Sequence, residues 1–143
     1  MDKLDEYYKF LAEKQTAVHD SGFEIADEDL NPKLFTFQRY CVKRALKTGR
    51  FAMFEDCGLG KTFQQLEWAY QVQKHINRPV LILAPLGIIG QTIKEGEHFG
   101  YEVKEIGLTV FDQDLKAGIY ITNYDNMENI DAYLFGGGCP KTY

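Results

Sequence analysis

Apolar residues recur along the chain at two different spacings, and each spacing predicts one kind of element. Steps of three and four residues place side chains on one face of a helix. They predict helices over residues 2–18, 33–50, 62–75, 88–99 and 125–134. Short unbroken apolar runs predict strands instead. Such runs cover residues 51–54, 80–84 and 119–122, and a further short strand is expected within 101–106.

The alternation of predicted strands and helices indicates the fold class. The predicted strands are apolar at nearly every position rather than at alternate ones, which is typical of a parallel sheet covered on both faces. The sequence therefore predicts a three-layer α/β fold, with an incomplete parallel sheet and helices on both faces. Residues 51–54, 80–84 and 119–122 are expected to be parallel neighbours in that sheet.

Charge divides the first third of the chain into an acidic and a basic stretch. Residues 20–29 hold five acids and no base, and they are expected to form a connector that Phe23 and Ile25 attach to the core. Residues 33–50 hold six Lys or Arg and no acid. Thr36 is expected to cap this basic helix. Its expected buried face consists of Phe37, Cys41 and Ala45.

The composition is that of one folded domain with an acidic balance. The chain has 143 residues, 45% of them hydrophobic, and a formal net charge of -5. This charge does not favour nucleic-acid binding, since phosphate contacts need Lys and Arg, but a local basic patch leaves the question open. Three cysteines without metal-ligand spacing indicate reduced thiols in a cytoplasmic protein. A charged N-terminus and short apolar runs argue against a signal peptide and a membrane span.

The candidate chemistry lies in one turn between a predicted strand and a predicted helix. Residues 54–62 read Phe-Glu-Asp-Cys-Gly-Leu-Gly-Lys-Thr. The glycines let the backbone fold tightly, so that N–H groups and the start of the next helix can face a phosphate. Lys61 can reach the β- and γ-phosphates of a nucleotide, and the Thr62 hydroxyl can bind Mg²⁺. The turn therefore predicts a phosphate-binding loop, or Walker A motif.

This turn departs from the strict pattern G-x-x-x-x-G-K-[ST] at one position. Glu55 stands where the first glycine would be. The plainer interpretation is a glycine-rich strand–helix turn with a solvated lysine. The apolar run before the turn and the amphipathic helix after it favour the phosphate-binding interpretation.

The turn and three other segments carry a resemblance to a known family. Residues 55–62 resemble motif I of superfamily 2 helicases and translocases, nearest the chromatin-remodeller-like branch of phage or bacterial type. Residues 34–40 resemble the upstream glutamine motif of that family, with Gln38 as the residue that reads adenine. Residues 81–86 resemble motif Ia, and residues 119–124 resemble motif Ib. The four segments occur in the family's order.

The resemblance implies a nucleotide-dependent motor. It implies a partial RecA-like ATP-binding domain over residues 31–143, preceded by a helix and acidic connector over 1–30. ATP and Mg²⁺ are the implied cofactors, and DNA or RNA is the implied partner of the parent protein. The implied nucleotide-binding residues are Gly58, Leu59, Gly60, Lys61, Thr62 and Gln38, with Thr62 also a metal ligand. The residues implied to line the nucleic-acid track are Pro85, Thr122 and Asn123.

The acidic Walker B motif of such motors is not found after residue 124. Residues 135–143 hold three glycines and a proline and cannot make a core strand. We therefore expect a motor domain cut before Walker B, without its second domain, without a catalytic residue and inactive alone; Asp125 is a weak substitute. A sheet left uncovered in this way favours homo-oligomers. Two alternatives stay open: a complete small nucleotide kinase or GTPase, and a non-catalytic interaction protein that reuses the fold.

Overall fold

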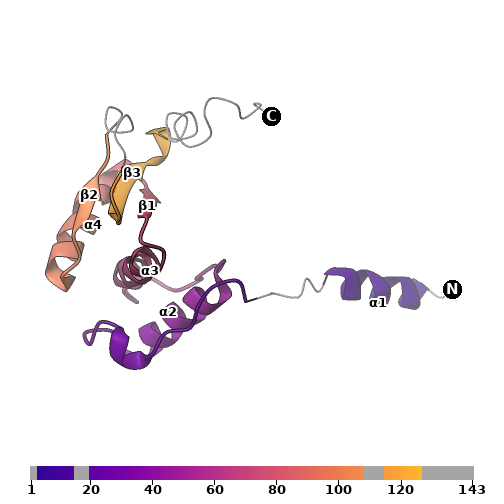
Figure 1. Ribbon diagram of the computed structural model, residues 1–143. Coiled ribbons are helices and arrows are strands. Elements are labelled where there is room, and N and C mark those ends of the chain that lie inside the picture. Colours follow the sequence, from indigo (N-terminus) through magenta and orange to yellow (C-terminus); the bar gives the residue numbers. More distant parts are fainter. Residues whose placement is uncertain (1–2, 15–19, 108–114, 127–143) are drawn as a thin grey trace.

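The computed structural model describes residues 3–14, 20–107 and 115–126 (Figure 1). The helices are α1 (Lys3–Lys14), α2 (Thr36–Thr48), α3 (Lys61–Ile76) and α4 (Leu86–Phe99), with 3-10 turns η1 (Asp27–Asp29) and η3 (Tyr124–Asn126). The strands are β1 (Pro79–Ala84), β2 (Val103–Glu105) and β3 (Gly118–Asn123). All four longer helices agree with predicted ones. Of the brief helix expected over 125–134, only η3 is seen, and residues 127–134 lie outside the described residues.

The described sheet is parallel and has three strands in the order β1-β3-β2. Strand β3 lies in the middle, where Ile121 pairs with Ile82 of β1 and Ile119 pairs with Val103 of β2. Residues 119–122 are buried because β3 has a neighbour on each edge as well as side chains packed on its faces. The mixed α/β class is thus confirmed, as are the parallel pairing of 80–84 with 119–122 and the short strand within 101–106.

The expected strand at residues 51–54 is not present. Residues 51–56 have no regular secondary structure, and Phe54 is 97% exposed. A strand needs a neighbour to bond its N–H and C=O groups, and no described strand pairs with this segment. An apolar sequence alone does not supply that neighbour. The prediction that 51–54 joins 80–84 and 119–122 in one sheet is therefore wrong.

Helix α3 lies at the centre of the described structure (Figure 1). It contacts α2, α4 and the strands β1 and β3. Its side chains Leu66 and Ala69 are fully buried in the main hydrophobic cluster, which also holds Val42 of α2 and Ile121 of β3. Burial of this kind stabilises the fold by about 25 cal/mol per Å² of apolar surface. The start of α3, which follows the glycine turn, is thereby fixed relative to α2 and α4.

Helix α2 begins and packs differently from the expectation. Thr36 is its first residue, and no side chain caps it; the Phe35 N–H instead donates to Oε1 of Gln38 at 2.9 Å. Ala45 is buried as expected, but Cys41 is only half-buried and Phe37 is 43% exposed. The buried face consists of Gln38, Val42, Ala45, Leu46 and Thr48. The buried face is rotated by one position because Gln38 turns inward, where its side chain makes hydrogen bonds. The spacing of apolar residues does not indicate such a buried polar side chain.

The acidic connector is attached to the core through Phe23 and Ile25, as predicted, and it is also bonded to α2. Phe23 and Ile25 pack against the main cluster, and the N–H groups of residues 21–23 donate to carbonyls at the end of α2. Lys43 Nζ lies 2.6 Å from Asp27 Oδ1, and Lys47 Nζ lies 2.6 Å from Glu24 Oε1. The acidic stretch therefore neutralises part of the basic face of α2.

Candidate phosphate-binding site

The glycine turn contains two residues in the left-handed region of backbone conformation. Gly58 and Gly60 have φ angles of 81° and 74°, which L side chains rarely adopt and which glycine reaches without strain. Gly60 is the N-cap of α3. The first N–H groups of α3 lack helical partners and carry the positive end of the helix dipole, so they can donate hydrogen bonds to a phosphate group.

Lys61 lies folded back over this loop. Its Nζ donates to the backbone carbonyls of Glu55 and Asp56, each at 2.9 Å. The side chain is exposed. Neutral carbonyls bind an ammonium group more weakly than phosphate oxygens do, because a phosphate adds its own charge to the hydrogen bond. The lysine is thus placed to exchange these carbonyls for a phosphate.

Thr62, the implied metal ligand, is half-buried in the first turn of α3. Among the described residues, no group of three His, Cys, Asp or Glu gathers to form a metal site. Mg²⁺ commonly binds through one or two protein oxygens while water and phosphate oxygens complete its shell. Binding of a nucleotide-borne Mg²⁺ ion through Thr62 stays a prediction.

Gln38, the implied adenine reader, is next to the loop. Its side chain is 3% exposed, its Nε2 donates to the Leu59 carbonyl at 2.9 Å, and its Oε1 accepts from Phe35 N–H. The fold thus brings Gln38 together with residues 58–62, although they lie twenty positions apart. One amide hydrogen and one oxygen lone pair remain for other partners.

Gln64, under the loop, was missed by sequence reasoning, and so were its bond to Glu55 and the proximity of Cys41 to Glu55. Gln64 is fully buried, and its Nε2 donates to Glu55 Oε2 at 2.7 Å and to the Leu59 carbonyl at 3.3 Å. Burial and then the nearby Glu55 carboxylate raise the pKa of the Cys41 thiol. Glu55, the departure from the strict motif, therefore joins α2 and α3 below the turn. The position of Gln64, one helical turn after Lys61, was the available signal.

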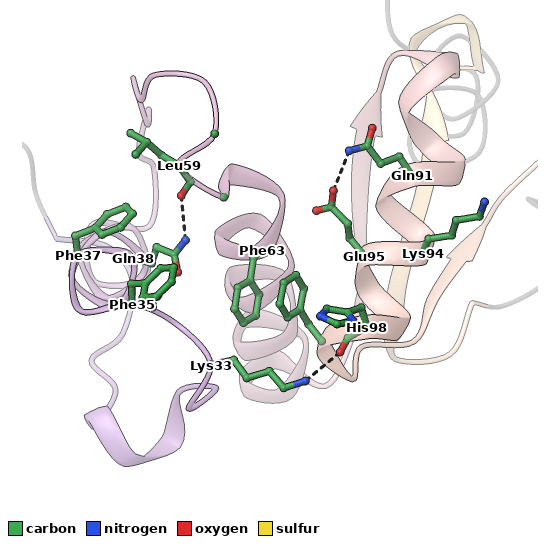
Figure 2. A pocket seen from close by; sticks show the side chains of 13 residues that line it. Lys33, Phe35, Phe37, Gln38, Leu59, Phe63, Gln91, Lys94, Glu95 and His98 are labelled. Atoms are coloured by element: carbon green, nitrogen blue, oxygen red, sulfur yellow. Dashed lines mark hydrogen bonds between the residues drawn. The ribbon is translucent and has the colours of Figure 1, made fainter.

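A cavity of about 1010 Å³ opens beside the loop. Figure 2 shows Phe35, Phe37 and Gln38 on one side, residues of α4 on the other, and Phe63 of α3 between them. Phe63 and Phe99 are stacked with ring centroids 3.7 Å apart. The polar lining residues are Lys33, Gln38, Gln91, Lys94, Glu95 and His98. An aromatic floor with a polar rim suits a flat ring that carries hydrogen-bonding groups.

The three residues implied to touch nucleic acid lie at one end of the sheet. Asn123 pairs with Ala84, so Pro85 follows β1 at the same carboxyl end. Thr122 is fully buried; its hydroxyl donates to the Ile106 carbonyl at 2.8 Å and accepts from Asn126 Nδ2 at 2.8 Å. Thr122 is thus positioned to hold the strand end, whereas Pro85 is exposed and Asn123 half-buried. Nucleic-acid contact at these residues stays a prediction.

A buried polar network fixes the middle of α3, and sequence reasoning missed it. The Tyr101 hydroxyl donates to Glu67 Oε2, and Asn31 Nδ2 donates to the Tyr101 oxygen at 2.9 Å. Gln71 Nε2 donates to Glu67 Oε1 at 2.7 Å. Burial, and then the Glu67 carboxylate, raise the pKa of Tyr101 above its usual range. The network ties α3 to residue 31 and to the turn after α4.

Comparison with protein-family models, curated proteins and solved structures finds no match to the chain. In the part of the chain that the structure describes, none of the helices has the length and apolar character needed to cross a membrane.

Proposed function

We propose that the chain binds the phosphates of ATP through residues 58–62, as part of a motor domain of the superfamily 2 helicase or translocase type. The observation that carries this proposal is the glycine turn before α3, with φ angles of 81° at Gly58 and 74° at Gly60 and with Lys61 folded over it. Backbone N–H groups, a helix N-terminus and a lysine together form a phosphate site. The three-layer P-loop fold of such motors is part of the same proposal.

The cavity beside the loop supports a nucleotide rather than a free anion. It is lined by Gly58 and Gly60 at one end and by aromatic side chains beyond them (Figure 2). A nucleotide whose phosphates lie at the loop extends its base toward the aromatic residues. Lys94 and Lys33 belong to its polar rim, and Lys33 Nζ donates to the His98 carbonyl at 3.1 Å at the aromatic end. Mg²⁺ would enter with the phosphates and be held by Thr62.

The proposed partner of the parent motor is DNA or RNA. Support comes from the carboxyl end of the parallel sheet, where Pro85 and Asn123 lie next to each other through the pairing of β1 and β3. Loops at the carboxyl ends of parallel strands are where α/β proteins bind their ligands. The acidic net charge and the paired lysines of α2 restrict such contact to this local edge.

Isothermal calorimetry with ADP and ATP in the presence of Mg²⁺ tests the proposal. The parent chain should bind, and Lys61→Ala should weaken binding at least about tenfold, because a charge-assisted hydrogen bond to phosphate contributes roughly 1.5–3 kcal/mol. Lys74→Ala is the matched control, since Lys74 is an exposed lysine in the last turn of the same helix. Equal affinities for the parent and Lys61→Ala would contradict phosphate binding at this loop.

A further inference from the structure

The carbonyl of Leu59, in the middle of the glycine turn, accepts hydrogen bonds from two side-chain amides. Gln38 Nε2 of α2 donates to it at 2.9 Å, and Gln64 Nε2 of α3 donates at 3.3 Å. Figure 2 shows the first of these bonds, which points from the cavity wall to the loop. Two different helices therefore hold one peptide group of the loop.

Both glutamines are themselves held at a second point. Gln38 Oε1 accepts from the Phe35 N–H at 2.9 Å, and Gln64 Nε2 also donates to Glu55 Oε2 at 2.7 Å. Their side chains are 3% and 0% exposed. Gln38 is bonded at both ends of its amide, whereas Gln64 makes both of its bonds through Nε2, and its buried Oε1 has no hydrogen-bond partner among the described residues. Two bonds on each buried amide limit its rotation, so each can fix the direction of the carbonyl that it touches.

The direction of this carbonyl determines where the next N–H points. The peptide bond is planar and trans, so the Leu59 C=O and the Gly60 N–H point in opposite directions. Because the carbonyl is held by α2 and α3, the Gly60 N–H is turned away from them. Gly60, on one side of this peptide, has no side chain and a positive φ angle of 74°, so the peptide can rotate more freely unless something holds it. A Cβ on Gly60 would lie 2.5 Å from Gln38 Nε2, which shows how closely the amide approaches.

The geometry points to Gln38 and Gln64 as positioning residues that orient the Leu59–Gly60 peptide so that its N–H faces a bound phosphate. This inference rests on the proposed phosphate binding. In this role Gln38 acts on every ligand that carries phosphates, whether or not a base is attached. An adenine reader, by contrast, acts only on ligands that carry the base.

The test compares a ligand with a base and one without it. The affinities of the full chain for ADP and for inorganic tripolyphosphate are measured by calorimetry for the parent, Gln38→Met and Gln64→Met. Methionine keeps the length of glutamine and removes its amide. Gln71→Met is the matched control, because Gln71 is also 3% exposed and hydrogen-bonded but lies at the other end of α3. Spectra of chain labelled with ¹⁵N-glycine report the loop directly through the Gly58 and Gly60 amides.

Each outcome decides for or against the inference. Gln38→Met and Gln64→Met should weaken both ligands by the same factor, about tenfold, and should shift the Gly58 and Gly60 signals, while Gln71→Met does neither. Loss of ADP affinity alone in Gln38→Met would overturn the inference and leave phosphate binding intact. Unchanged loop signals would overturn it as well. If the parent binds neither ligand but the Gly60 signal still moves in both loop variants, the positioning role stands and the proposed function fails.

Discussion

At the scale of single residues, the site depends on polar side chains that are buried rather than exposed. Gln38, Gln64 and Glu67 are each 3% exposed or less, and all three bond partners on other elements. A buried polar group that loses its partner costs more than the bond itself contributes, because it is then left without water. Substitutions at such positions are therefore more informative than substitutions at the surface.

Tyr101→Phe should destabilise the chain by about 1–3 kcal/mol, since it removes the donor to the buried Glu67 Oε2 and one of the acceptors of the Asn31 amide. Chemical denaturation followed by circular dichroism measures the change. Tyr120→Phe is the control: Tyr120 is also buried, but its hydroxyl donates to the carbonyl of the exposed Lys116 at 3.0 Å. The network has no structural role if the two substitutions cost the same.

The residues of the loop could be predicted from the sequence, but the side chains that hold the loop in place could not. Residues 58–62 could be predicted as a phosphate site from the sequence alone, because glycine, lysine and threonine at this spacing indicate phosphate binding before the fold is known. Gln38 was predicted as a site residue from the resemblance to the glutamine motif, and in the structure it is hydrogen-bonded to the loop. Gln64 has only its position one helical turn after Lys61 as a signal, and the roles of Gln64 and Glu55 arise only when α2 and α3 pack together. Thr122, which the resemblance implies to touch nucleic acid, is buried.

At the scale of elements, pairing between strands decided which predictions held. The sequence runs at 80–84, 119–122 and 51–54 are all apolar, yet only the first two form strands. Each of those two has the other as its neighbour. Strand pairing is a long-range contact that depends on which other strands are present, whereas helices close their hydrogen bonds within one segment. This is why α2, α3 and α4 were predicted more accurately than the sheet.

The attachment of the acidic connector to α2 should weaken at low pH. Ion pairs with Lys47 and Lys43 lower the pKa values of Glu24 and Asp27. Carboxyls with lowered pKa values contribute stability above their unfolded pKa of about 4, and this contribution is lost as the pH falls through the folded value. The Phe23 N–H, which donates to the Leu46 carbonyl at 3.0 Å, should exchange faster there after correction for the intrinsic rate.

At neutral pH, the double variant Glu24→Gln, Asp27→Asn should raise the Phe23 exchange rate modestly, by about twofold, because exposed ion pairs contribute little. Glu28→Gln is the control, since Glu28 is an acid of the same connector with no ion pair in the structure. High salt should reproduce the effect of the double variant in the parent. Equal exchange rates in all three chains would show that apolar packing of Phe23 alone holds the connector.

At the scale of the whole molecule, apolar surface remains outside the described core. Phe54 is 97% exposed and Phe51 47%, and β1 has a strand on only one of its edges in the described sheet. Exposed aromatic residues beside an unpaired strand edge favour association. We expect the chain to form dimers or larger species, measured by light scattering over a range of concentrations. Phe54→Ser should shift the distribution toward monomer, and a monomeric parent at high concentration would contradict the expectation.

The last prediction is that the chain does not turn over ATP, with or without DNA or RNA. Transfer of the γ-phosphoryl group spreads negative charge over its oxygens, and catalysis consists mostly of placing charges and water around it. Lys61 supplies one such charge. The two acids beside the loop are engaged elsewhere, because Glu55 binds Gln64 under the turn and Asp56 Oδ1 accepts from the Cys57 N–H at 2.8 Å. Asp125, at the end of β3, accepts from the Asn123 amide.

Lys61 alone is not expected to supply the charge that this transfer needs. In GTPases and ATPases an arginine finger alone contributes roughly 10³–10⁵ in rate, and it comes from the same chain or from a partner protein. A carboxylate that fixes Mg²⁺ and one that aligns water act together with it, so their losses are not additive, but each alone is large. A phosphate-release assay measures any remaining ATP turnover by the purified chain, with the Lys61→Ala variant assayed as the control. Steady release that disappears in Lys61→Ala would contradict this prediction and favour a complete small phosphotransferase, in which Asp125 is the first acid to replace.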